Sequence, residues 1–143
     1  MEYLRNAKSR CSPQEEHIIS SENKIVHNAY NCDKNHVRQY KLDGDIFPPN
    51  TQPIRCDFLV INDDKNAAYF IELSSYKKIK HAIDQLQQSY RMLQPELHGA
   101  TCYFCLVLNT ATTKATLRGK RLRDWKAGGH KRKFGSSPMN DCI

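Results

Sequence analysis

The sequence predicts a single α/β domain with a central mixed sheet of four to five strands flanked by helices. The chain of 143 residues is long enough for one hydrophobic core. Two apolar segments at 55–61 and 67–74 are separated by a polar turn. A segment with helical periodicity then leads to a third, continuously apolar segment at 102–108. Strands joined through a helix are typical of an α/β fold.

The N-terminal part of the chain carries the signature of a helix start. Ser12 occupies a capping position, Pro13 lies in the first turn, and Glu15 follows three residues after the serine. We therefore predict an N-terminal helix that continues through residues 17–30, although the pair Ser20-Ser21 interrupts its apolar face. Residues 36–42 alternate between polar and apolar side chains and predict the first strand.

Two acidic residues interrupt the apolar segments of the predicted hairpin. Asp57 lies in the first segment and Glu72 in the second. A carboxylate within an apolar strand costs free energy unless it is paired, bound to a ligand or placed at the strand end. On neighbouring strands the two carboxylates would be close enough to share one hard divalent cation. A purely structural pair is the alternative.

The segment that follows predicts a helix and then a buried strand. Residues 78–94 place apolar side chains at three-and-four spacing, and Pro95 ends the pattern. The run at 102–108 is continuously apolar, as expected for a strand that is covered on both faces. A strand, a helix and a second strand in this order predict a right-handed crossover between parallel neighbours.

The net charge of +7 arises from the C-terminal segment. Residues 1–113 contain 13 basic and 13 acidic side chains, whereas residues 114–133 contain nine basic side chains and Asp124. We therefore divide the chain into an α/β domain at 1–113 and a basic segment at 114–143, which is partly disordered or adds an edge strand. Such a concentration of positive charge attracts nucleic acid, with Trp125 and Phe134 available to stack on bases. A solvated tail is the alternative. The candidate nucleic-acid-binding residues are Lys120, Arg121, Arg123, Lys131, Arg132 and Lys133.

The cysteine spacing and the lengths of the apolar runs indicate in which cellular compartment the protein is expected. Cys102 and Cys105 form a lone C-x-x-C on a predicted strand, where residues three apart point to opposite faces and do not share a metal. No apolar run reaches the length of a membrane span, and the first residues lack the apolar core of a signal peptide. We expect a cytoplasmic protein with reduced thiols and no membrane partner.

The order and spacing of these elements resemble the restriction-endonuclease-like, or PD-(D/E)XK, core over roughly residues 15–110. The run Arg55-Cys56-Asp57-Phe58-Leu59-Val60 is similar to its aspartate strand, and Phe70-Ile71-Glu72-Leu73-Ser74 to its E-x-K strand. The run Ala82-Ile83-Asp84-Gln85-Leu86 resembles the helix that follows. Glu22 resembles the additional acidic residue that many members place beside the metal.

The resemblance implies a metal-dependent nuclease that hydrolyses phosphodiester bonds. Asp57, Glu72 and the carbonyl of Leu73 would hold Mg²⁺ or Mn²⁺, with Glu22 beside them. Gln85 would hydrogen-bond near the metal or the substrate, or lie on the surface. Small members of the superfamily often form homodimers in which two sites face two strands.

One residue departs from the family pattern. The position of the motif lysine holds Ser74, which has no positive charge. Lys78 or Lys80, at the start of the following helix, would substitute for it, or both are solvated and the lysine is lost. The sequence thus predicts a nuclease weakened by this change. The alternatives are a catalytically degenerate module that binds nucleic acid or a protein partner, and a basic α/β domain whose match is accidental.

Overall fold

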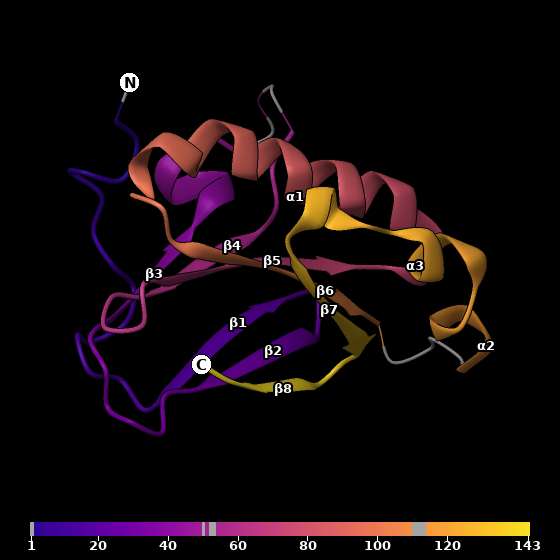
Figure 1. The fold of residues 1–143 in the computed structure, drawn as a ribbon, viewed down its shortest axis with the longest axis horizontal. Coiled ribbons are helices and arrows are strands. Elements are labelled where there is room, and N and C mark those ends of the chain that lie inside the picture. The colour runs from indigo at the N-terminus through magenta and orange to yellow at the C-terminus, as the bar shows by residue number, and fades with distance from the viewer. Residues whose placement is uncertain (1, 50, 52–53, 110–113) are drawn as a thin grey trace.

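A mixed five-stranded sheet lies between one long helix and a second, three-stranded sheet (Figure 1). The computed structural model describes residues 2–49, 51, 54–109 and 114–143, so the predicted domain boundary at 113 lies outside the described residues. Helix α1 (Ile79–Leu93) covers one face of the large sheet, and the small sheet covers the other. The chain is therefore an α/β protein. Among the described residues, no helix is both long and apolar enough to cross a bilayer.

The large sheet combines an antiparallel meander with a parallel half. Its strand order is β3-β4-β5-β6-β7, and the first three strands are antiparallel neighbours, whereas β5, β6 and β7 run parallel. The predicted strands and the predicted parallel crossover are confirmed. The bounds are β3 (Val37–Lys41), β4 (Phe58–Asn62), β5 (Ala67–Ser74), β6 (Thr101–Leu108) and β7 (Lys131–Ser136).

Helical segments fill the connections of this sheet. Helix α1 joins β5 to β6, and the predicted helix at 78–94 is confirmed. The short helices α2 (Lys114–Leu117) and α3 (Lys120–Asp124) lie between β6 and β7. The connections also contain four short helical turns, which are η1 (Leu42–Ile46), η2 (Tyr76–Lys78), η3 (Gln94–Glu96) and η4 (Ala127–Gly129).

The prediction of an N-terminal helix is wrong. Strands β1 (His17–Glu22) and β2 (Ile25–Tyr30) form an antiparallel hairpin, and β8 (Met139–Cys142) pairs with β2 in parallel. Buried and exposed positions alternate with period two along both strands of the hairpin, which is the period of a strand. Asn23 and Lys24 adopt φ of 51° and 64°, as a two-residue type I′ turn requires. The helix-start signature of residues 12–15 therefore precedes a strand.

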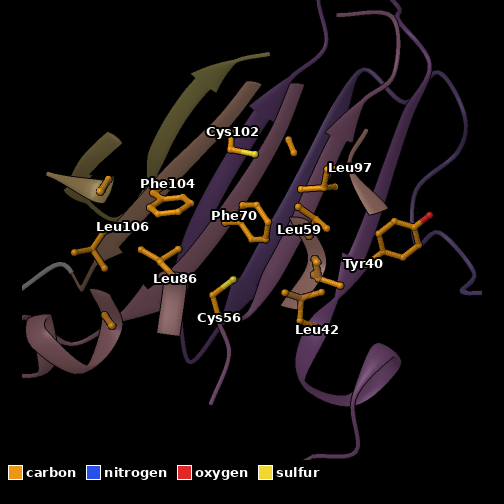
Figure 2. Close-up of a cluster of buried hydrophobic side chains, with 14 of the residues drawn as sticks. Tyr40, Leu42, Cys56, Leu59, Phe70, Leu86, Leu97, Cys102, Phe104 and Leu106 are labelled. Atoms are coloured by element: carbon orange, nitrogen blue, oxygen red, sulfur yellow. The ribbon is translucent and has the colours of Figure 1, made fainter. Parts of the chain in front are cut away.

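The central strands β4, β5 and β6 of the large sheet are largely buried on both faces. On the α1 side, Phe70 packs edge-on against Phe104 with ring centroids 5.8 Å apart, and Figure 2 shows Phe70 between Leu59 and Phe104. On the other side, apolar residues of β4, β5 and β6 pack against the hairpin, with Ile71 fully buried. Coverage of both faces explains why these strands are continuously apolar.

The C-terminal segment belongs to both sheets. Strand β7 extends the large sheet and β8 extends the small one. Trp125 is only 4% exposed, and its ring lies 6.5 Å from that of Phe134. The expectation that Trp125 stacks on bases is therefore wrong, because its ring is part of the core.

Candidate functional site

The candidate site lies at one end of the central strands of the large sheet, where β5 ends and β4 begins. Asp57 immediately precedes β4, and its backbone N–H donates to the carbonyl of Ile71 at 3.1 Å. Glu72 follows Ile71 in β5. The hairpin of the small sheet reaches the same end, since the Val26 N–H donates to the Ser137 hydroxyl just after β7 at 2.9 Å. This end of the sheet therefore collects side chains from segments far apart in the sequence.

The structure brings the carboxyl groups of Asp57, Glu72 and Glu22 together. One oxygen of Asp57 accepts a hydrogen bond from the Leu73 N–H at 2.8 Å, which fixes the carboxyl at the end of the strand. Burial and the neighbouring Glu22 carboxylate raise the pKa of Asp57 to about 7. Burial and the adjacent Asp57 raise the pKa of Glu72 well above its ordinary value. The charged forms of these two neighbouring carboxyls, one buried and one half-buried, are thus disfavoured.

The acidic cluster is defined as Glu22, Asp57 and Glu72. No described Lys, Arg or His forms an ion pair with any of its three members. Glu72 is 4% exposed, and its buried Oε1 has no hydrogen-bond partner within the described chain. A buried carboxylate without a donor needs a proton or a cation. Carboxylate oxygens are the ligands that Mg²⁺ and Mn²⁺ prefer.

The three carboxyls differ in how closely they approach. In the described part of the chain, only one set of three Asp, Glu, His or Cys side chains has ligand atoms all within 4.8 Å of one another, and it lies elsewhere. Asp57 interacts with the carboxyls of both Glu22 and Glu72, and it is therefore the central member of the acidic cluster. Leu73, the fourth predicted ligand, lies between Glu72 and Ser74 at the same strand end.

The position of the motif lysine is filled by a short neutral side chain. Ser74 is buried on the same face of β5 as Glu72, and its hydroxyl donates to the Ser75 carbonyl at 3.2 Å. The predicted substitutes, Lys78 and Lys80, are both exposed at the start of α1. Lys80 lies 4.0 Å from Asp84, one helical turn along the same helix. Neither lysine is ion-paired with the acidic cluster.

These lysines instead contribute to a surface hollow, here called the basic hollow. It lies between the start of α1 and α3. Asp84 is its single acidic member, so a negatively charged ligand is favoured there. The residues that line it are Lys77, Lys78, Lys80, His81, Asp84 and Arg121.

Gln85 positions the chain that leads to Asp57. Its side-chain amide donates to the Arg55 carbonyl at 3.0 Å, so it contacts backbone two residues before the carboxylate. Ser89, one turn further along α1, accepts a hydrogen bond from the Cys56 N–H at 2.6 Å and donates to the Gln85 carbonyl at 2.9 Å. Sequence reasoning missed Ser89, although its spacing of four from Gln85 places both on one helix face.

We expect Ser89→Ala to destabilise the protein by roughly 1–3 kcal/mol, because it leaves the buried Cys56 N–H without an acceptor. Chemical unfolding of the variant beside the wild type measures this loss. Gln88→Ala, a neighbouring change on α1, is the matched control and should cost much less. Equal stabilities of Ser89→Ala and the wild type would show that this hydrogen bond does not hold the Asp57 segment.

The predicted nucleic-acid-binding residues do not form one stripe. Lys120, Arg121 and Arg123 are exposed on α3, and the Arg132 guanidinium donates to the Leu122 carbonyl on the same side. Lys131 and Lys133 alternate with Arg132 along β7 and therefore lie on the opposite face, where both stand over the ring of Tyr103. Lys133 also donates to a carboxylate oxygen of Asp141. Lys133 is thus engaged within the fold.

Comparisons with protein-family models, with curated proteins and with solved structures found no match to this chain. The acidic cluster and the basic hollow are therefore the features of the molecule that indicate a function.

Proposed function

We propose that this chain is a metal-dependent nuclease in which Asp57 and Glu72 hold a Mg²⁺ or Mn²⁺ ion. One observation carries the proposal. Buried Glu72 and half-buried Asp57 lie side by side at a strand end, and the Oε1 atom of Glu72 has no hydrogen-bond partner among the described residues. No described Lys, Arg or His is ion-paired with either carboxyl. A divalent cation would stabilise the two carboxylates, because it supplies a positive charge that no ion pair within the described residues provides.

The topology supports a restriction-endonuclease-like fold. The meander β3-β4-β5, the helix α1 and the parallel strand β6 follow one another as in the PD-(D/E)XK core that the sequence resembles. The hairpin takes the place of the N-terminal helix expected from that resemblance, and it still delivers Glu22 to Asp57. The acidic neighbour is thus retained on a different element.

The residues of the chain would divide the work of phosphodiester hydrolysis among them. A bound divalent ion supplies Lewis acidity and lowers the pKa of a coordinated water. Asp57 is held in place by the Leu73 N–H, and Gln85 and Ser89 fix the backbone before it. The site is therefore positioned by backbone contacts and by α1, as the orientation of metal ligands requires.

The basic hollow would hold the phosphate backbone of the substrate. Exposed positive charge is provided by Lys77, Lys78 and Lys80 around the start of α1, which follows the β5 strand end that carries Glu72. Arg121 adds to this charge from α3. Contacts of this type fix the register of a nucleic acid without reading its sequence, and they weaken with salt.

The proposal is tested by incubating the protein with single- and double-stranded DNA and RNA in Mg²⁺, in Mn²⁺ and in EDTA. Cleavage that requires the metal supports a nuclease. The second candidate is a degenerate module that binds nucleic acid. Ser74 favours it, as does the absence of any ion pair between these carboxyls and a Lys, Arg or His of the described residues. Salt-sensitive binding without cleavage in either metal would establish that module instead.

Restoring a lysine at the motif position is expected to raise the cleavage rate about tenfold or more. In Ser74→Lys the ammonium group would replace a hydroxyl on the same face of β5 as Glu72, where positive charge stabilises the phosphoryl transition state. Initial rates in Mn²⁺ measure the gain. Ser75→Lys, one residue later and on no shared strand face, is the control. A folded Ser74→Lys protein that binds metal but cleaves no faster would contradict a merely weakened nuclease.

A further inference from the structure

A second group of potential metal ligands lies between the two sheets. It consists of His27 on β2, Cys105 on β6 and Asp141 on β8, and is called the interlayer cluster below. Within the described residues, it is the set of three whose ligand atoms all lie within 4.8 Å of one another. Cys105 pairs in register with Ile71 and points to the small sheet, whereas Glu72 points to the opposite face. The interlayer cluster is therefore separate from the acidic cluster.

Three buried polar atoms of the interlayer cluster have no hydrogen-bond partner among the described residues. His27 is fully buried, and neither of its ring nitrogens has a hydrogen-bond partner in the described chain. The Oδ2 atom of Asp141 is also buried without a partner. His27 Nε2 and Asp141 Oδ2 are 3.7 Å apart, which is too long for a hydrogen bond. Each unsatisfied buried polar group lowers the free energy of unfolding by about 1–3 kcal/mol. A group of them therefore indicates a bound water or ion.

The donor set and its spacing match a transition-metal site. One imidazole nitrogen, one thiolate sulfur and one carboxylate oxygen are the ligand types of Zn²⁺, which favours tetrahedral coordination. Ligand bonds of about 2.0–2.2 Å place two nitrogen or oxygen ligands about 3.3–3.6 Å apart at a tetrahedral centre. The separation of 3.7 Å between His27 and Asp141 is close to this edge length.

We propose that His27, Cys105 and Asp141 bind a Zn²⁺ ion that joins the small sheet to the large one. Lys133 supports this geometry, because its ammonium donates to Oδ1 of Asp141 and leaves Oδ2 directed at His27. Strand β8 is an edge strand, and the side chain of Asp141 is 9% exposed, so the interlayer cluster lies close to the edge of the small sheet. The ion would link β2, β6 and β8, which pair within different sheets.

The test is a titration of the metal-free, full-length protein with Co²⁺, a spectroscopic substitute for Zn²⁺. We expect a thiolate-to-cobalt charge-transfer band that saturates at one equivalent, is lost in Cys105→Ala and is displaced by Zn²⁺. His27→Gln should weaken Co²⁺ binding at least tenfold. The matched control is Cys142→Ser, which removes an exposed thiol on the same strand as Asp141 and should keep the band.

A measurement on the wild type keeps the test decisive if the core variants fail to fold. Zn²⁺ at a small excess should raise the unfolding temperature of the protein, and Mg²⁺ should not produce the same shift, because a thiolate site prefers the softer ion. Absence of a charge-transfer band would overturn the proposal, as would a band lost in Cys142→Ser and kept in Cys105→Ala. The interlayer cluster would then be an ion pair of Lys133 and Asp141 beside a buried histidine.

Discussion

Asp57→Asn is expected to stabilise the metal-free protein at pH 8 by roughly 2–4 kcal/mol more than at pH 5. The pKa of Asp57 rises from 3.8 to about 7 on folding, chiefly because of burial and the nearby Glu22. Between pH 4 and 7 the folded protein therefore binds a proton that the unfolded chain has released. Stability that is fully present below pH 4 is lost as the pH rises through about 7. An amide does not ionise, so the variant escapes this loss.

The measurement is chemical unfolding at pH 5 and pH 8 in the presence of EDTA. Asparagine keeps an oxygen that can accept the Leu73 N–H, so the local hydrogen bond is preserved. Glu16→Asn, at an exposed carboxyl before β1, is the control and should show no such pH-dependent gain. Equal effects of Asp57→Asn at the two pH values would show that the Asp57 carboxyl is ionised at little cost and needs no cation.

Glu72→Gln is expected to reduce metal-dependent cleavage by roughly 1,000-fold while the protein stays folded. Glutamine fills the same buried volume on β5, but it removes a negative charge from the pair that would hold the ion. Binding of nucleic acid to the basic hollow should persist, because Lys77, Lys78 and Arg121 are unchanged. The variant thus separates substrate binding from hydrolysis.

Initial cleavage rates in Mn²⁺ and binding isotherms in EDTA measure the two effects of Glu72→Gln. Glu16→Gln, at an exposed carboxyl, should cleave at the rate of the wild type. A Glu72→Gln protein with unimpaired cleavage would place the catalytic metal elsewhere in the molecule. Loss of both cleavage and nucleic-acid binding would indicate a misfolded variant. Circular dichroism shows whether the variant is folded.

The central part of the fold could be predicted from the sequence because its signals are local. The apolar runs of β4, β5 and β6 and the helical periodicity of α1 each fall within one short window. The turn between β4 and β5 is short, so the proximity of Asp57 and Glu72 also followed from local spacing. The hairpin was missed because the helix-start residues 12–15 are a strong local signal, while its own turn, Asn23-Lys24, lacks glycine.

Long-range pairing accounts for what the sequence did not reveal. Strand β8 pairs with β2 across more than 100 residues, and this pairing brings Asp141 to His27. No sequence spacing relates those two residues to Cys105, so the interlayer cluster had no signal in the chain. From the sequence alone, Lys133 is a candidate nucleic-acid-binding residue. In the fold its ammonium group instead donates to Asp141 on β8. Such groupings depend on the tertiary arrangement.

The proposed nuclease requires the acidic cluster to be a divalent-cation site. Binding of Mn²⁺ at pH 8, measured by calorimetry or electron paramagnetic resonance, tests this most directly. Mn²⁺ is a hard ion that suits carboxylates better than a site with a thiolate. We predict saturable binding to the wild type that weakens as the pH falls below about 7, since protons compete for Asp57, and that is lost in Glu72→Gln. Mn²⁺ binding of equal affinity in the wild type and in Glu72→Gln, or no binding to the folded wild type, would contradict the account.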